Sequence, residues 1–63
     1  MHLYVYDGIV KEFGRTIADK WHGETVAESE KKARSNLTYQ YKKSHNKSNN
    51  TKITLTSEII QIN

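Results

Sequence analysis

The sequence predicts a small α+β domain of ββαβ order, with a small antiparallel sheet and a single helix packed on one face. Three features predict it: two early segments rich in β-branched and aromatic residues, a capping pattern before a lysine-rich middle, and a late apolar alternation. A chain of 63 residues has room for one core only, because a domain of this size buries roughly 60% of the surface of its unfolded form. We expect a single domain over residues 1–63.

The first two strands are expected at about residues 2–12 and 15–22. The dipeptide Asp7-Gly8 is either a hairpin turn or a bulge within one long strand whose turn lies at Phe13-Gly14. We favour the bulge, because the segment after Gly14 then forms a second strand of matching length.

Alternation in the second strand predicts which side chains share a face. Ile17, Asp19 and Trp21 would lie on one face, and Thr16, Ala18 and Lys20 on the other.

The helix is expected at about residues 26–43. Thr25 and Glu28 have the spacing of a capping box, in which the Thr25 hydroxyl and the Glu28 carboxylate each accept a hydrogen bond from a backbone amide at the start of the helix. The apolar face is thin, and Leu37 and Tyr41 supply most of its burial. The predicted face consists of Val26, Ser29, Ala33, Leu37, Gln40 and Ser44, with Tyr41 at its border.

The last strand is expected at about residues 52–62, after a polar loop over residues 44–50. Ile53 and Leu55 occupy odd positions, whereas Ile60 and Ile62 occupy even ones. Because side chains alternate between the faces of a strand, this change predicts a bulge, bend or strand end at Ser57-Glu58.

Charge is segregated along the chain, although the net charge is only +3. Residues 1–30 carry a net charge of −3, residues 31–52 carry seven cations and no acid, and the last eleven residues carry one acid. Charge blocks of one sign are informative about partners. The basic segment is therefore the principal candidate for a functional surface.

A helical wheel places most of these cations opposite the apolar face, around Tyr39. Such a face can neutralise phosphates, and Tyr39 can stack on a base or sugar. The alternatives are a merely solvated face or a face for an acidic protein partner, since Glu28 precedes Lys32 by four residues and late cations suit the helix dipole. A merely solvated face does not explain seven cations without an acid. The predicted nucleic-acid-binding residues are Lys31, Lys32, Arg34, Tyr39, Lys42 and Lys43.

Catalysis and metal binding are not expected. The chain has no cysteine, which removes thiolate chemistry, disulfides and cysteine-based metal sites. His2, His22 and His45 lack metal-ligand spacing, and the glycines are isolated and do not form a phosphate loop. We predict a non-enzymatic binding protein with no catalytic residue, metal or cofactor.

We expect a cytoplasmic protein without a membrane association. No apolar run approaches the ~20 residues that span a bilayer, the chain starts without a signal-peptide pattern, and the lack of cysteine fits an intracellular protein.

The open face of the sheet suggests a second class of function. One helix covers only one face, so part of the aromatic set from the two early strands stays exposed. If Tyr4 and Tyr6 lie on the open face, they form a stacking platform or a dimer patch. The alternative function is a protein–protein adaptor or homodimerising module with no nucleic-acid role.

Several short strings carry a resemblance over nearly the whole chain: Tyr6-Asp7-Gly8, Glu12-Phe13-Gly14, Ile17-Ala18 with Trp21, Gly23-Glu24-Thr25, and Ser29 to Leu37. The sequence resembles small uncharacterised proteins of conjugative elements and phages of Gram-positive bacteria. The resemblance implies a bacterial cytoplasm and a mobile-element setting, where DNA-handling accessories are common. It transfers no site residue.

Overall fold

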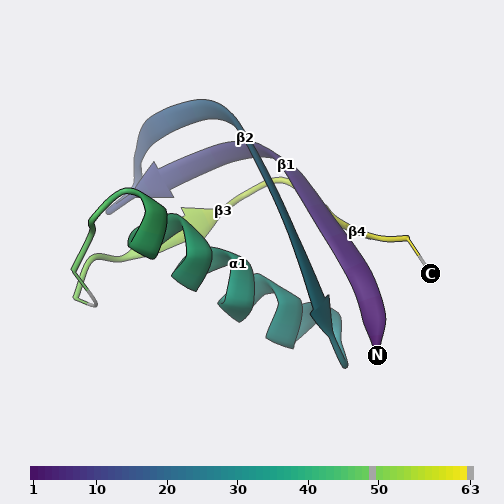
Figure 1. Cartoon of the computed structure of the whole chain (residues 1–63). Coiled ribbons are helices and arrows are strands. Elements are labelled where there is room, and N and C mark those ends of the chain that lie inside the picture. The colour runs from purple at the N-terminus through teal and green to yellow at the C-terminus, as the bar shows by residue number, and fades with distance from the viewer. Residues whose placement is uncertain (49, 63) are drawn as a thin grey trace.

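The computed structural model describes residues 1–48 and 50–62 and contains one antiparallel sheet and one helix in the order ββαββ (Figure 1). The predicted α+β class, with one helix on one face of the sheet, is confirmed. The elements are β1 (His2–Glu12), β2 (Arg15–Ala27), α1 (Glu30–Ser44), β3 (Ile53–Leu55) and β4 (Ile59–Gln61).

β1 is the central strand of the sheet. β2 pairs along one edge of β1, while β3 pairs with Val10–Glu12 and β4 pairs with Tyr4–Tyr6 along the other edge. The strand predicted at residues 52–62 is thus two short strands. They separate at residues 56–58, where the change in apolar positions predicted a break.

The β1–β2 hairpin turns at Phe13 and Gly14, as predicted. Both residues have positive φ angles, 50° and 83°, a combination that suits the twist of a tight hairpin. The alternative turn at Asp7-Gly8 is therefore wrong, because both residues pair with β2 within one continuous strand.

β2 has extra residues in the half of the hairpin near the turn. Gly8–Val10 lies opposite Ala18–Trp21, and Val10–Lys11 lies opposite Thr16–Ala18. Each mismatch adds one residue to β2, and such bulges bend a strand and increase its twist. β2 accordingly rises in an arch over β1 and then descends toward the start of α1 (Figure 1). The predicted bulge lies close to its expected place, but the extra residues belong to the second strand.

These bulges change which side chains of β2 face the core. Ala18 and Trp21 both pack against the core, whereas Ile17 and Asp19 are exposed. The prediction that Ile17, Asp19 and Trp21 share a face is wrong, because simple alternation does not continue through a bulge.

The helix begins later than predicted. Thr25 pairs with Tyr4 and Val26 pairs with Leu3, so the expected capping box belongs to the end of β2. β2 thus continues to Ala27, five residues beyond the predicted end at His22. The N-cap is Ser29, whose Oγ accepts a hydrogen bond from the Lys32 amide at 3.2 Å.

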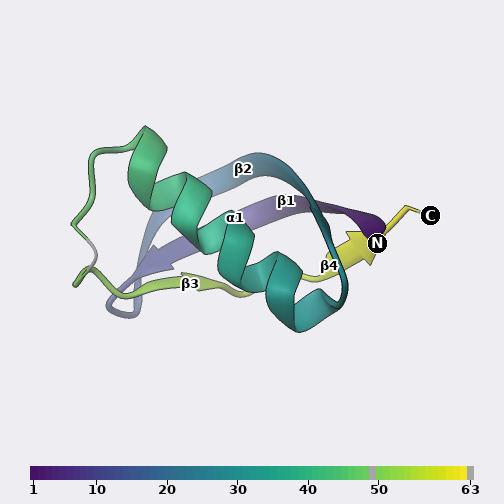
Figure 2. The same ribbon diagram turned by 60° about the horizontal axis from the view of Figure 1, so that its bottom comes forward.

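The core lies between α1 and one face of the sheet. Ala33, Leu37 and Tyr41 are the buried residues of α1, and they meet side chains from all four strands. The predicted face is confirmed for these three, but Gln40 is half-buried, Ser44 is exposed, and Val26 and Ser29 lie outside the helix. Figure 2 shows α1 lying across β1, β2 and β3. The buried cluster comprises Tyr4, Tyr6, Val10, Ala27, Ala33, Leu37, Tyr41, Ile53, Leu55 and Ile59.

Tyr6 joins the centre of the sheet to the break between β3 and β4. Its side chain is fully buried, and its hydroxyl donates to the Ile9 carbonyl while accepting from the Ser57 amide at 3.1 Å. The Ile9 amide donates to Ser57 Oγ at 3.4 Å. A Cβ on Gly8 would overlap the Ser57 side chain, so this close approach requires glycine.

Tyr6→Phe should lower the free energy of unfolding by about 1–3 kcal/mol, because it leaves the Ile9 carbonyl and the Ser57 amide without this partner. Urea denaturation followed by circular dichroism measures the change. Tyr39→Phe is the matched control, since its side chain is exposed, and it should change stability by less than about 0.5 kcal/mol. Equal losses in both variants would contradict the assigned role of Tyr6.

Candidate nucleic-acid interface

Hydrogen bonds on both flanks fix the rotation of α1 on the sheet. On the β2 side, Asn36 Nδ2 donates to Thr25 Oγ1 at 3.3 Å and Gln40 Nε2 donates to the Glu24 carbonyl at 3.0 Å. On the β3 side, the Arg34 guanidinium donates to the Leu55 carbonyl. With Leu37 buried between them, these contacts determine which side chains of α1 point away from the sheet.

The outward face of α1 consists of lysines around one tyrosine. Lys31, Lys32 and Lys43 are exposed, and Tyr39 between them is 58% exposed. Lys42 is half-buried at the edge of this face. Within the described part of the chain, no carboxylate lies within 4.0 Å of the Lys31, Lys32 or Lys43 ammonium groups. Their charges are available to a ligand.

Arg34 differs from the other predicted site residues. Besides its bond to the Leu55 carbonyl, its guanidinium lies 3.7 Å from the Glu30 carboxylate one turn earlier. Its side chain is half-exposed, and its guanidinium already contacts the Leu55 carbonyl and the Glu30 carboxylate. Arg34 therefore holds α1 against β3 and is a weaker candidate for phosphate binding than the exposed lysines.

Two shallow depressions meet at Tyr39. One extends toward the start of α1 and the other toward the loop that follows the helix. The first is lined by Lys31, Arg34, Ser35, Thr38, Tyr39 and Lys42, and the second by Tyr39, Lys42, Lys43, Asn46, Lys47 and Ser48. The tyrosine ring thus stands between two cationic hollows.

Ser35 and Lys47 line these hollows but were not among the predicted site residues. A helical wheel predicts the position of Ser35 on the outward face. It lies between the pair Lys31 and Lys42 on one side and the pair Lys32 and Lys43 on the other. Lys47 could not be placed from the sequence, because it lies in a loop. Its ammonium is 3.1 Å from the Glu12 carboxylate at the end of β1.

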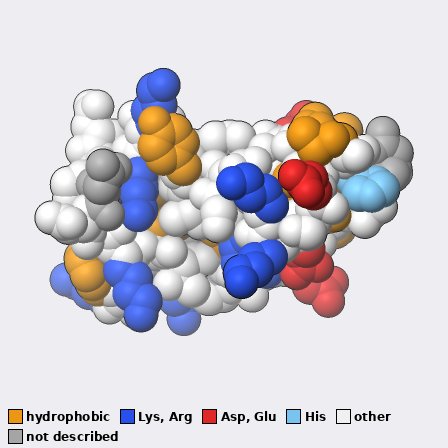
Figure 3. Space-filling model, turned by 90° about the horizontal axis from the view of Figure 1, so that it is seen from below, with side chains coloured by type: hydrophobic (Ala, Val, Ile, Leu, Met, Phe, Trp, Pro, Cys, Tyr) orange, Lys and Arg blue, Asp and Glu red, His pale blue; other side chains and the backbone are white. Residues whose placement is uncertain are grey.

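Charge is unevenly distributed on this side of the molecule. Figure 3 shows lysine and arginine side chains over much of the surface, while acidic side chains gather at the end where α1 begins. Glu28 and Glu30 are exposed at that end. An anionic ligand is therefore favoured over the middle and the C-terminal half of α1.

The sheet does not provide an aromatic platform. Tyr4 and Tyr6 are buried beneath α1, and the exposed residues of the opposite face include Asp7, Glu24 and Val26. The condition under which the two tyrosines would form a stacking surface is not met. The basic face of α1 carries the candidate interface alone.

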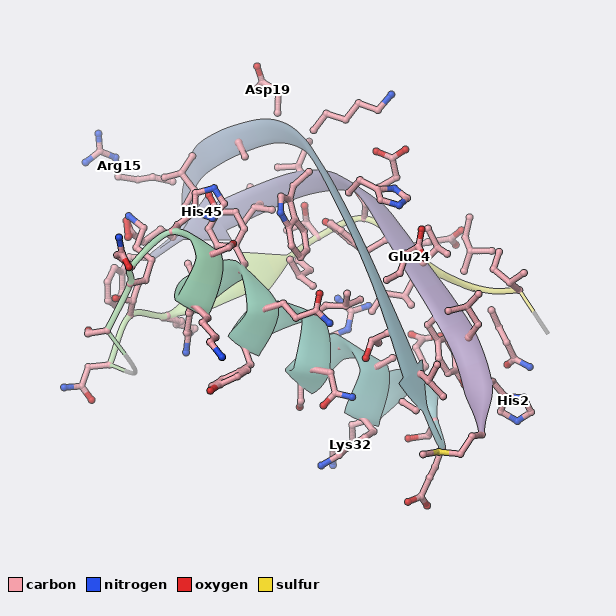
Figure 4. All side chains as sticks on the ribbon, in the orientation of Figure 1. His2, Arg15, Asp19, Glu24, Lys32 and His45 are labelled. Atoms are coloured by element: carbon pink, nitrogen blue, oxygen red, sulfur yellow. The ribbon has the colours of Figure 1, made fainter. Side chains whose placement is uncertain are left out.

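The three histidines are dispersed. His22 pairs with Glu24 at 2.9 Å on the surface, and the His45 ring stacks on Tyr41 with their centroids 4.1 Å apart. His2 and His45 lie at opposite ends of the molecule (Figure 4). Among the described residues, no three side chains of His, Cys, Asp or Glu form a group suited to a metal ion.

No protein-family model, curated protein or solved structure matches this chain. Over the described ranges, α1 is too short and too polar to cross a bilayer.

Ser29→Ala should destabilise the protein by about 1 kcal/mol, because it removes the acceptor for the Lys32 amide at the start of α1. Ser35→Ala, on the exposed side of the same helix, should be neutral or slightly stabilising. Chemical denaturation of both variants measures the difference. An equal loss from Ser35→Ala would exclude a specific capping effect at Ser29.

Proposed function

We propose that this protein binds nucleic acid through the outward face of α1, without catalysing a reaction. The observation that carries the proposal is the arrangement of Lys31, Lys32 and Lys43, which lack carboxylate partners in the described structure, around the exposed Tyr39. Lysines supply affinity for phosphates that is largely independent of sequence. A tyrosine ring among them supplies a surface for a base or sugar.

The setting we propose is a bacterial cytoplasm, in which the protein is an accessory of a mobile genetic element. The support is the resemblance to small proteins of conjugative elements and phages. DNA-handling accessories are common in such a setting, which fits a small basic domain. An acidic protein partner would use the same lysines, so nucleic-acid binding must be measured directly.

Binding should weaken strongly with salt, because phosphate contacts release counterions. Lys42→Glu combined with Lys43→Glu should reduce affinity for labelled DNA on the order of 10- to 100-fold at about 50 mM salt. Fluorescence anisotropy measures the titration. Arg15→Glu combined with Lys20→Glu makes the same change in net charge on the hairpin, away from α1, and should have a much smaller effect.

Two results would contradict the proposal. The first is the absence of binding to single- or double-stranded DNA at low salt. The second is an equal loss of affinity in both double variants, which would show that net charge matters and the face of α1 does not.

Self-association through the open face of the sheet is the second candidate function. Leu3 lies between Val26 and Ile62, and Val5 lies beside Ile60, so branched apolar side chains adjoin across three strands. Val26 is 54% exposed and Ile60 is 58% exposed.

A dimer formed in this way should dissociate in Ile60→Asp, because the contact would bury the introduced carboxylate. Sedimentation velocity over a concentration series measures the monomer fraction. Ile17→Asp places the same change near the hairpin turn, at the opposite end of β1 and β2, and should leave the equilibrium unchanged. A wild-type protein that stays monomeric at all concentrations would remove this candidate.

A further inference from the structure

The lysines of α1 form two parallel rows. Lys31 and Lys42 make one row, and Lys32 and Lys43 make the other. In each row the residues are three turns apart, which separates them by about 16 Å along the axis, and the rows are about 100° apart around it. Each flank of the outward face thus carries a row of positive charge.

The strip between the rows is uncharged and faces directly away from the sheet. It contains Ser35 and Tyr39, both exposed. Leu37, fully buried, lies on the opposite side of the helix. A ligand that approaches α1 therefore meets hydroxyl groups in the centre and ammonium groups on both sides.

This pattern matches a duplex groove better than a single strand. Two phosphate backbones border a groove, and each can meet one row, whereas a single strand has one backbone. An α-helix with its side chains is about 10–12 Å in diameter, close to the roughly 12 Å width of the major groove of B-form DNA. The minor groove, about 6 Å wide, is too narrow.

RNA duplexes fit this geometry poorly. The major groove of A-form RNA is deep and narrow, so a helix with its side chains cannot enter it, and the wide minor groove is shallow.

We propose that the ligand of α1 is double-stranded B-form DNA, with the side of the helix in the major groove; this inference rests on the proposed nucleic-acid function. Lys31 and Lys42 contact one backbone, and Lys32 and Lys43 contact the other. Tyr39 then faces the base edges in the groove and does not stack between bases.

The acidic start of α1 determines how the helix enters. Glu28 and Glu30 are exposed there, and phosphates repel carboxylates. An approach with the helix N-terminus first is therefore disfavoured. The helix instead lies on its side, so that both rows of lysines face the phosphate backbones.

The test compares labelled DNA duplex, DNA single strand and RNA duplex of equal length by anisotropy at several salt concentrations. We expect the DNA duplex to bind roughly tenfold or more tightly than the other two. Two double variants each remove one row: Lys31→Gln with Lys42→Gln, and Lys32→Gln with Lys43→Gln. In each of them the slope of log affinity against log salt concentration should become shallower by about 1.8, since two phosphate contacts are lost. Protection of guanine N7 from methylation reports occupancy of the major groove.

The outcomes separate this inference from the proposed function. Any of three results would overturn the duplex assignment alone. They are a single strand or RNA duplex that binds as tightly as the DNA duplex, a salt dependence that only one of the two row variants alters, and guanine N7 atoms that stay unprotected. Failure of every nucleic acid to bind would overturn the proposed function itself. Arg15→Gln with Lys20→Gln, on the hairpin, is the matched control and should leave the salt dependence unchanged.

Discussion

The buried hydroxyl of Tyr6 is the contact on which the arrangement of the sheet depends. Tyr6 lies in the central strand, and its hydroxyl joins the Ile9 carbonyl to the Ser57 amide. It therefore holds the segment between β3 and β4 against β1, so that both short strands can pair along the same edge. Without β3 in this place, the Leu55 carbonyl would not be available to Arg34, and α1 would lose its contact on that flank.

The same constraint orients the basic surface. A sheet held on one edge by β2 and on the other by β3 gives α1 polar partners on both flanks, while Leu37 and Tyr41 fill the space below. The lysines then point outward because no other direction is open to them. The packing of the opposite side of the helix thus exposes its lysines, and the loop after the helix contributes only to the lining of one hollow beside Tyr39.

Local patterns in the sequence predicted the fold class, the turn at Phe13, the buried face of α1 and the break before β4. They failed where pairing between distant residues decides the structure. Thr25 and Glu28 have capping spacing, yet Thr25 pairs with Tyr4 in the sheet, and Ser29 caps instead. The bulges of β2 depend on its register with β1. At the site, the wheel placed the lysines outward, but it could not show that Arg34 turns toward the Leu55 carbonyl of a strand 21 residues later.

The first and last strands bring the two ends of the described chain together. The Ile62 amide donates to the Leu3 carbonyl at 2.8 Å, and both ends lie across the molecule from the C-terminus of α1 (Figure 1). A fluorophore or an affinity tag joined to either end would therefore be held far from Lys42 and Lys43. The same adjacency makes the fold suited to insertion into a loop of another protein, where both junctions must enter and leave at one point.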